Sequence, residues 1–296
     1  MIKILCYHSI DENDSLLSIT PSLFQKQMEH LKRYKHKIIS LSEAIHYLTS
    51  GEKLSESYVV ITFDDGYKNF YLHAFPILKK FNFTATVFLV PKYINKEADW
   101  VQRDFKEFHS IQGNLSVDIK DLIVRNKTLF QNRFPHFYRI PPKRLLLIVD
   151  KLFRNTNLPI LSWEDVQEIN QYGIEFGTHS YSHPFLNELT LTHARDEIWK
   201  SKVEIENHIH KPVYSFCYPY GAFNSKIQKL LKDLGFRCAC TTETGINNRK
   251  NYDLFALKRI SISTATGLLK FRLYLSSLYD IYSLWKGKRS VPTLST

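Results

Sequence analysis

Apolar and polar positions alternate along the chain in a way that predicts repeated strand–helix units. Short apolar runs recur between longer segments in which apolar residues return every three or four positions. The runs predict strands at residues 2–7, 37–40, 58–63, 84–90, 174–178, 213–218, 236–242 and 256–262. Such units favour parallel strands that are wrapped by helices.

Helix-starting and helix-ending residues support the intervening elements. Thr20 followed by Pro21 is typical of a helix start, and Phe24, Met28 and Leu31 then give that helix one apolar face. Further helices are predicted at 42–48 with Gly51 beyond it, 162–172 ended by Gly173, 192–209, and from a cap at Asn224 to Gly235. The expected fold class is therefore α/β: eight strands with helical crossovers that close into a barrel.

Residues of chemical interest follow the ends of these strands. In a barrel of this kind the chemistry gathers where the strands end. The residues found there are His8, Asp64, Asp65, His179, His183 and the loop 218–221. This agreement supports the barrel because the strands were assigned without using it.

One segment interrupts the pattern. Strand–helix alternation is lost from about residue 93 to 161, although helices are predicted at 99–108, 118–127 and 142–153. We interpret this segment as a mostly helical insertion on the active-site side of a single domain that spans residues 1–296. A lid, a substrate-binding wall and a partner surface are all open roles for it.

Two pairs of residues predict a metal site. The adjacent carboxylates Asp64 and Asp65 follow a buried run and precede Gly66. Such a pair repels itself and is costly to desolvate, which indicates a metal ion or a proton transfer. One aspartate with His179 and His183 gives three ligands and leaves an open coordination position, as in catalytic sites. The other aspartate would take a proton from water. Each pair alone also fits a solvated turn or surface histidines; their combination favours the metal site.

The motifs resemble a known family. Thr-Phe-Asp-Asp-Gly at 62–66, His-Ser-x-x-His at 179–183 and Pro-Tyr-Gly at 219–221 resemble the polysaccharide deacetylases of carbohydrate esterase family 4, or NodB-homology domains. The resemblance covers most of the chain apart from the insertion and the C-terminal tail. It implies a distorted (β/α)7–8 barrel, and an enzyme that removes N-acetyl groups from sugars with Zn²⁺ or a similar ion.

The resemblance also implies residue roles. Asp64 would be the general base, and Asp65, His179 and His183 would bind one divalent ion. The backbone N–H of Tyr220 would help to hold the oxyanion. Two histidines and one aspartate suit Zn²⁺ and also accept Co²⁺, Ni²⁺ or Mn²⁺.

The chain departs from the family pattern at two positions. The family usually has Arg-x-Pro-Tyr where this chain has Cys217 in the arginine position, and Leu-x-His where this chain has Arg259 in the histidine position. Some deacetylases of exported poly-N-acetylglucosamine carry the acid histidine near the start of the domain. Because the first and last strands of a closed barrel are neighbours, we predict His8 as the general acid. Arg259 is predicted to supply the guanidinium near Asp64. The alternatives are a structural histidine bonded to a nearby carboxylate, and a plain surface or salt-bridge arginine.

Composition limits the partners and the location. The chain has 40 Lys and Arg against 29 Asp and Glu, but the basic residues are scattered and no nucleic-acid motif is present. The four cysteines form no CxxC pair and are expected to be small buried thiols. The first residues lack the features of a signal peptide, and no apolar run is long enough to span a bilayer. A cytoplasmic protein is therefore expected.

The tail at about 267–296 combines apolar, aromatic and basic residues. A basic amphipathic helix there would either pack on its own domain or lie on the inner face of a membrane.

These observations predict a metal-dependent hydrolase that removes N-acetyl groups from amino sugars of a polysaccharide or a glycan precursor. Two alternatives stay open: a non-catalytic glycan-binding protein that keeps the fold, and an amidase that acts on another acyl group. The intact acid and histidine pairs favour the enzyme, because a pure binder needs no base beside a metal.

Overall fold

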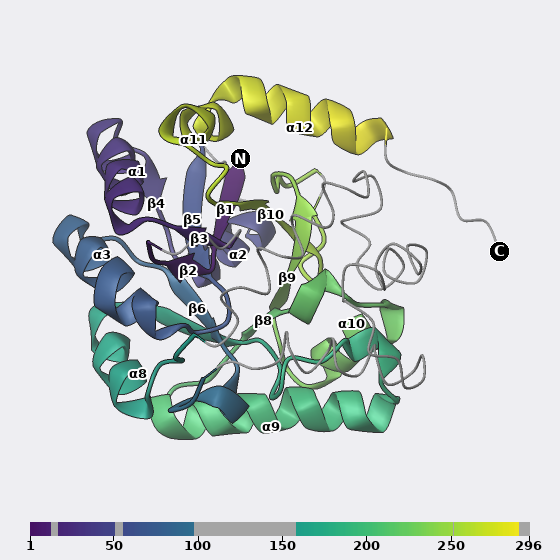
Figure 1. Cartoon of the computed structure of the whole chain (residues 1–296). Coiled ribbons are helices and arrows are strands. Elements are labelled where there is room, and N and C mark those ends of the chain that lie inside the picture. Colours follow the sequence, from purple (N-terminus) through teal and green to yellow (C-terminus); the bar gives the residue numbers. More distant parts are fainter. Residues whose placement is uncertain (13–16, 51–55, 98–157, 251, 290–296) are drawn as a thin grey trace, which may run out of the picture.

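The computed structural model describes residues 1–12, 17–50, 56–97, 158–250 and 252–289. Its main sheet contains parallel strands in the order β1-β10-β9-β8-β7-β6-β5-β4, and β1 also pairs with β5. Seven strands therefore close into a ring, with β4 outside it, and the predicted β/α barrel is confirmed (Figure 1). The strands are β1 (Ile2–Tyr7), β4 (Lys37–Ile38), β5 (Tyr58–Phe63), β6 (Thr86–Leu89), β7 (Glu175–Thr178), β8 (Ser215–Cys217), β9 (Cys238–Thr244) and β10 (Leu257–Ser261).

The ring is distorted at β5. Strand β1 pairs with β5 along its whole length, from Tyr58 to Phe63. On the other edge, β4 pairs with Tyr58 and Val59, whereas β6 pairs with Thr62 and Phe63. Two short strands thus share one edge of β5, and only β6 continues the ring.

Side chains alternate between the barrel interior and the helix layer, as the pleat of a strand requires. On β1, Ile2 and Ile4 belong to the interior cluster, whereas Leu5 and Tyr7 belong to the larger cluster under the helices. Helix α2 (Leu41–Thr49) adds Leu41, Ala44 and Leu48 to the interior cluster. The Ser42 amide donates to the carboxylate of Glu175, the first residue of β7. Helix α2 therefore closes the end at which the strands begin.

The other helices surround the ring (Figure 1). They are α1 (Pro21–Arg33), α3 (Phe75–Phe81), α8 (Trp163–Ile169), α9 (Leu191–Ile209), α10 (Ser225–Asp233), α11 (Leu268–Leu275) and α12 (Ser277–Arg289). The predicted caps are confirmed at Thr20 and Asn224, whose side chains accept hydrogen bonds from the first turns of α1 and α10. Helix α2 begins one residue earlier than predicted because Ser40 forms a capping box with Glu43.

Two local features were not predicted. Strands β2 (Ser9–Ile10) and β3 (Ser18–Ile19) form a separate parallel pair after β1. A π-helical turn at Phe70–Ala74 leads into α3, whose second residue is Pro76. Proline has no N–H for the regular helical bond, so a change of register before it is understandable.

The insertion lies largely outside the described residues, which include none of its three predicted helices. Its two ends are described and run antiparallel to each other: the Asn95 amide donates to Leu161 O and the Ile160 amide to Lys96 O. The Leu161 amide also donates to Gly66 O. The insertion therefore departs from and returns to the barrel directly beside Asp64 and Asp65. Its role stays a prediction.

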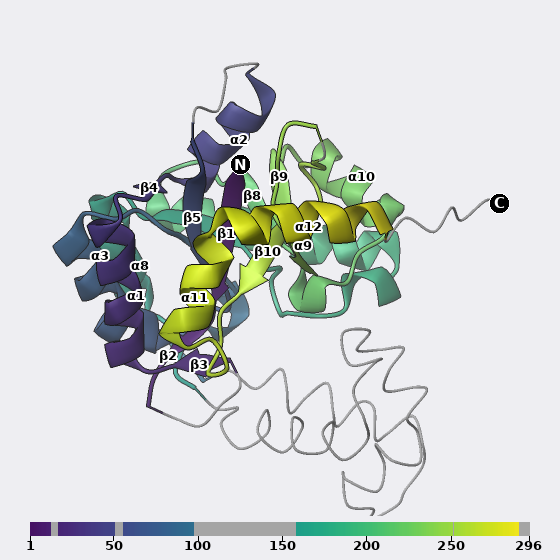
Figure 2. The same ribbon diagram turned by 90° about the horizontal axis from the view of Figure 1, so that it is seen from above.

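The tail forms two helices rather than one, with a break at Ser276 between α11 and α12. The Lys3 side chain on β1 is 1% exposed. Its Nζ donates to Leu275 O at 2.7 Å and to Ser276 O at 3.2 Å, and pairs with Asp280 at 2.8 Å. Packing of the tail on its own domain is thereby confirmed, beside the start of β1 (Figure 2).

One face of the tail remains exposed. Its apolar residues there are Leu269, Leu273, Leu278, Ile281 and Tyr282. Among the described residues, no helix combines the length and apolar character that crossing a membrane would require.

Candidate metal and catalytic site

The ends of β5, β7 and β1 deliver the predicted residues to one place. Asp64 and Asp65 directly follow β5, His179 directly follows β7, and His8 directly follows β1. The Asp65 Oδ1 atom lies 3.6 Å from His179 Nε2 and 3.6 Å from His183 Nε2. Ligand atoms about 2.0–2.2 Å from a tetrahedral ion lie roughly 3.3–3.6 Å apart. The donor set therefore fits one divalent ion with little rearrangement.

The backbone that carries the candidate ligands is held in an unusual conformation. Asp65, Ser180 and His183 have φ values of 74°, 62° and 60°, which is the left-handed region that non-glycine residues rarely adopt. Ser180 Oγ accepts from the His183 amide, and the amide and Oγ of Ser182 both donate to the Glu197 carboxylate on α9. Both serines between the histidines thus make hydrogen bonds that fix the loop carrying His179 and His183.

Hydrogen bonds also orient two of the candidate ligands, His179 and Asp65. His179 Nδ1 lies 2.7 Å from Cys217 O and donates to it in the tautomer that leaves Nε2 facing Asp65. Tyr67 makes a side-chain hydrogen bond to Asp65. Tyr67 was missed in the sequence, because a tyrosine two residues beyond an Asp-Asp pair has no distinctive pattern.

Burial sets the protonation of this cluster before any cation binds. Burial, with the Asp64 charge adding to it, raises the pKa of Asp65 to about 8. Burial lowers the pKa of His179 to about 4, so this imidazole is neutral near pH 7, the form that binds metals. A cation would thus replace a proton on Asp65 and meet an imidazole that is ready to bind.

Asp64 is clamped by Arg259. The guanidinium donates to Asp64 Oδ1 at 2.7 Å and to Oδ2 at 2.6 Å, and its Nε donates to Thr241 O. Arg259 is 1% exposed, so the pair lies inside the barrel. Burial alone would raise the pKa of Asp64, but the guanidinium outweighs it and holds that pKa well below its ordinary value. The structure places Arg259 against Asp64 and not on the surface.

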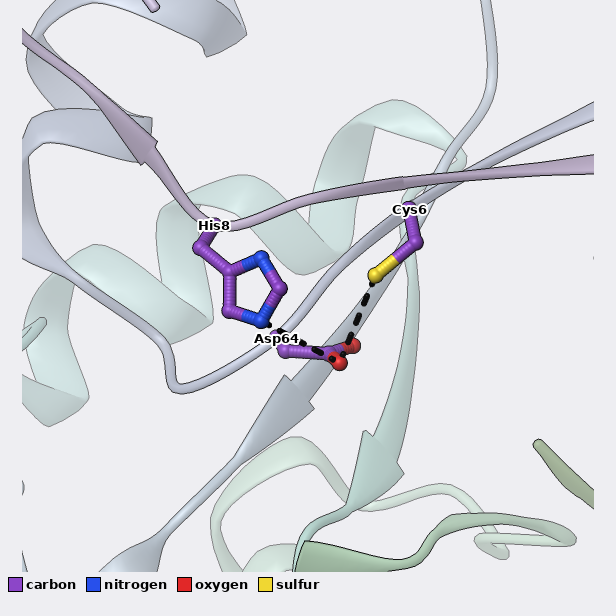
Figure 3. A group of neighbouring side chains, drawn as sticks. All are labelled: Cys6, His8 and Asp64. Atoms are coloured by element: carbon purple, nitrogen blue, oxygen red, sulfur yellow. Dashed lines mark hydrogen bonds and ion pairs between the residues drawn. The ribbon is translucent and has the colours of Figure 1, made fainter. Parts of the chain in front are cut away.

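His8 lies on the other side of Asp64, with its Nε2 3.8 Å from Asp64 Oδ2 (Figure 3). Its side chain is 19% exposed, against 3% for Asp64, so His8 stands between that carboxylate and solvent. Burial lowers the pKa of His8, with the Asp64 charge opposing the shift. Strand β1 pairs with β10 as well as β5, which confirms that the first and last barrel strands are neighbours.

Tyr220 lies in a short turn after β8 and has a φ of 58°. Its ring packs edge-on against His183, with centroids 4.6 Å apart, and stacks on Phe185 at 4.1 Å. Gly221 follows with a φ of +69°, and a Cβ there would collide with Thr242 Oγ1. Phe185 was not identified in the sequence; its only signal was its position two residues after His183.

All four cysteines are buried and free, as expected. Cys6 and Cys217 place their Sγ atoms 3.6 Å and 3.5 Å from Asp64 Oδ2. The surroundings of that carboxylate therefore include two thiols, one guanidinium and the imidazoles of His8 and His179.

A parallel β/α barrel with paired carboxylates and histidines at its strand ends is typical of hydrolases that use a bound metal. The polysaccharide deacetylase family model matches residues 51–239, which is more than half of the chain, so the chain belongs to this family.

Relatives agree with this assignment. The chain is 26% identical over 277 residues to the "Putative polysaccharide deacetylase YxkH" of Bacillus subtilis, covering 94% of this chain and 77% of that protein. It is 23% identical over 290 residues to the poly-beta-1,6-N-acetyl-D-glucosamine N-deacetylase of Escherichia coli, covering 90% of this chain and 37% of that protein.

Solved structures share the fold. The Streptococcus pyogenes deacetylase PplD, in complex with acetate, matches with a TM-score of 0.67 and 21% identity, covering 93% of this chain and 98% of that one. IcaB from Ammonifex degensii matches with a TM-score of 0.66 and 19% identity, covering 90% and 93%.

Proposed function

We propose that this protein is a metal-dependent deacetylase that removes N-acetyl groups from amino sugars of a glycan or a glycan precursor. The observation that carries the proposal is the arrangement around Asp64 and Asp65. A three-ligand cluster lies beside an arginine-clamped carboxylate, and an imidazole faces that carboxylate from the solvent side.

Asp65 Oδ1, His179 Nε2 and His183 Nε2 would hold the ion. A divalent ion held there, Zn²⁺ first and Co²⁺, Ni²⁺ or Mn²⁺ next, would supply Lewis-acid chemistry, polarising the acetamide carbonyl and lowering the pKa of a water.

The protein's own groups then handle the protons. Asp64 accepts a proton from the attacking water, and Arg259 keeps that carboxylate ionised beforehand. His8 lies within 3.8 Å of Asp64 and donates a proton to the departing amine. The backbone N–H of Tyr220, in the turn beside His183, is assigned to the oxyanion.

The two rival functions make different use of these groups. A glycan-binding protein has no use for a buried aspartate that is kept ionised at the cost of burying an arginine. An amidase for another acyl group would use the same residues, so only the substrate distinguishes it.

The relatives suggest which substrates to try. Several are named as N-deacetylases of poly-beta-1,6-N-acetyl-D-glucosamine, so oligosaccharides of this linkage are the first choice and chitooligosaccharides the second.

We further propose that the tail contacts a membrane surface. Its exposed apolar residues are flanked by the exposed Lys270 and Arg272, while the acidic Asp280 turns inward to Lys3. An exposed apolar face with cationic neighbours suits anionic lipid. Sedimentation with phosphatidylglycerol vesicles, but not phosphatidylcholine vesicles, and its loss in Leu273→Glu, would support this contact. Sedimentation with neither lipid would refute it. The cytoplasmic location stays a prediction of the sequence.

The decisive experiment is acetate release from this oligosaccharide panel by metal-reconstituted protein, beside an Asp64→Asn control and N-formyl analogues. Acetate release that disappears in the control supports the proposal. Formate release without acetate release would favour the other amidase. Oligosaccharide binding with one metal per chain and no release would favour the binding protein.

A further inference from the structure

A second cluster of metal-ligating atoms lies beside the one already described. Cys6 Sγ, His8 Nε2 and Asp64 Oδ2 all lie within 4.8 Å of one another. The carboxylate oxygen is 3.6 Å from the thiol sulfur and 3.8 Å from the imidazole nitrogen (Figure 3). An ion about 2.3 Å from sulfur and 2.0–2.2 Å from nitrogen or oxygen needs ligand separations of roughly 3.3–3.6 Å. Small side-chain movements would therefore let the three atoms share one ion.

This cluster is independent of the proposed resident site. In the described part of the chain, three such groups occur. Asp65, His179 and His183 form the first group. Another group combines Asp64 and Cys217 with His179, so it would compete with the first for that histidine. The group of Cys6, His8 and Asp64 takes no ligand from the first. Both ions could therefore be bound at the same time.

We propose that Cys6, His8 and Asp64 form a second, inhibitory site for a thiophilic divalent cation, such as Cd²⁺ or excess Zn²⁺. On binding, the Cys6 S–H bond breaks, its proton passes to solvent, and a metal–sulfur bond forms without any change of oxidation state. The ion also takes lone pairs from Asp64 Oδ2 and His8 Nε2. The inhibitory consequence rests on the proposed function, in which these two side chains exchange protons with the substrate and water.

Arg259 determines which ions the cluster accepts. Its Nη2 donates to the same Asp64 oxygen at 2.6 Å, so a second positive charge beside that oxygen is disfavoured. A thiolate ligand offsets this repulsion with a new negative charge. The cluster should therefore exclude Mg²⁺ and Ca²⁺, which prefer oxygen ligands, and accept ions that bind sulfur well.

The ion has a path of entry through His8. The His8 side chain is 19% exposed, whereas Cys6 is 2% exposed. An ion would therefore meet the imidazole first and then reach the thiol and the carboxylate.

The test is a Cd²⁺ titration of the metal-loaded full chain, followed by the ultraviolet absorption of cadmium–thiolate bonds. The resident metal is quantified after each step, and acetate release is measured in parallel. Cys6→Ser is compared with Cys238→Ser, which removes another fully buried barrel thiol that belongs to none of the three groups. Cys6→Ala and a circular dichroism spectrum of each variant guard against misfolding.

We expect one Cd²⁺ per chain to bind with cadmium–thiolate absorption while the resident metal stays in place. Cys6→Ser and Cys6→Ala should lose this absorption and raise the inhibition midpoint at least tenfold, while Cys238→Ser behaves like the wild type. Absorption that persists without Cys6, or Cd²⁺ that merely displaces the resident metal, would overturn the proposal. If the absorption follows the prediction but no substrate is turned over, the second site stands and the proposed function fails.

Discussion

The buried pair of Arg259 and Asp64 supports the sharpest prediction, which is the effect of Arg259→Met. Both carboxylate oxygens of Asp64 accept from the guanidinium, and both residues are almost fully buried. Methionine fills a similar apolar volume but leaves the carboxylate without its charged partner. Removing one member of a buried, hydrogen-bonded ion pair costs about 3–5 kcal/mol of unfolding free energy.

The dependence on pH follows from the pKa of Asp64. In the wild type this pKa lies below its value in the unfolded chain, so the stabilisation is complete above about pH 4 and is lost as the pH falls through the folded pKa. Without Arg259, burial dominates and raises that pKa above the unfolded value. The variant therefore gains relative stability when Asp64 protonates, and its deficit should be largest near pH 7 and smaller near pH 4.

The assay is urea unfolding of metal-free protein at both pH values. Lys258→Met is the matched control, because Lys258 is the preceding residue on β10 and its ion pair with Glu243 spans 3.6 Å between partly exposed side chains. That pair is worth at most about 1 kcal/mol. If Arg259→Met loses no more stability than Lys258→Met, or if its deficit is the same at pH 4 and pH 7, the reasoning is wrong.

Three further predictions concern the metal ligand, the tail and the Tyr220 turn. Because a cation must displace the proton of Asp65, metal affinity measured by chelator competition should rise about tenfold per pH unit up to about pH 8 and then level off; a flat profile would contradict this. Lys3→Met should lower the free energy of unfolding by about 3 kcal/mol and expose α11 and α12 to limited proteolysis. Adding Asp280→Leu should restore part of the lost stability. Unchanged proteolysis would show that the contacts of Lys3 do not hold these helices on the barrel. Gly221→Ala should lower stability by about 1–3 kcal/mol in thermal unfolding. Adding Thr242→Ala should restore only the part of this loss that is due to the collision of the new Cβ with Thr242. Full recovery would show that the positive φ of residue 221 does not strain the backbone.

The apolar runs predicted every barrel strand because each one is buried on both faces. The apolar runs overestimated the lengths of some strands, because a buried residue need not pair with a neighbouring strand. Val213 and Tyr218 are fully buried, yet they flank β8 and belong to no ladder. The split of the tail at Ser276 was also missed, because it depends on two carbonyls that turn toward Lys3 on β1.

The candidate site was predictable where its residues are neighbours in the sequence. Asp64 with Asp65, and His179 with His183, are local pairs at strand ends. His8 was reached only through the closure of the barrel, which brings β1 beside β10. Tyr67 and Phe185 were not found, since their contacts with Asp65 and Tyr220 depend on how loops fold back over the strand ends.

The two departures from the family pattern explain each other in the structure. By the resemblance described above, Cys217 stands where the family usually has an arginine, and Arg259 stands where it usually has a histidine. Arg259 Nη2 lies 3.2 Å from Cys217 Sγ, so the guanidinium that clamps Asp64 comes from β10, beside the small thiol on β8. Arg259 then occupies that position on β10, and His8, directly after the neighbouring β1, faces the same carboxylate.

Cys217, Arg259 and His8 should therefore behave as one coupled replacement. Restoring a single family residue should lower the stability of the protein. Cys217→Arg alone would bury a second guanidinium against the first, with one carboxylate between them, and should cost several kcal/mol. Adding Arg259→His removes the excess charge and should recover most of the loss in thermal unfolding. A Cys217→Arg protein as stable as the wild type would show that the positions are independent, and that the small thiol beside Arg259 is incidental.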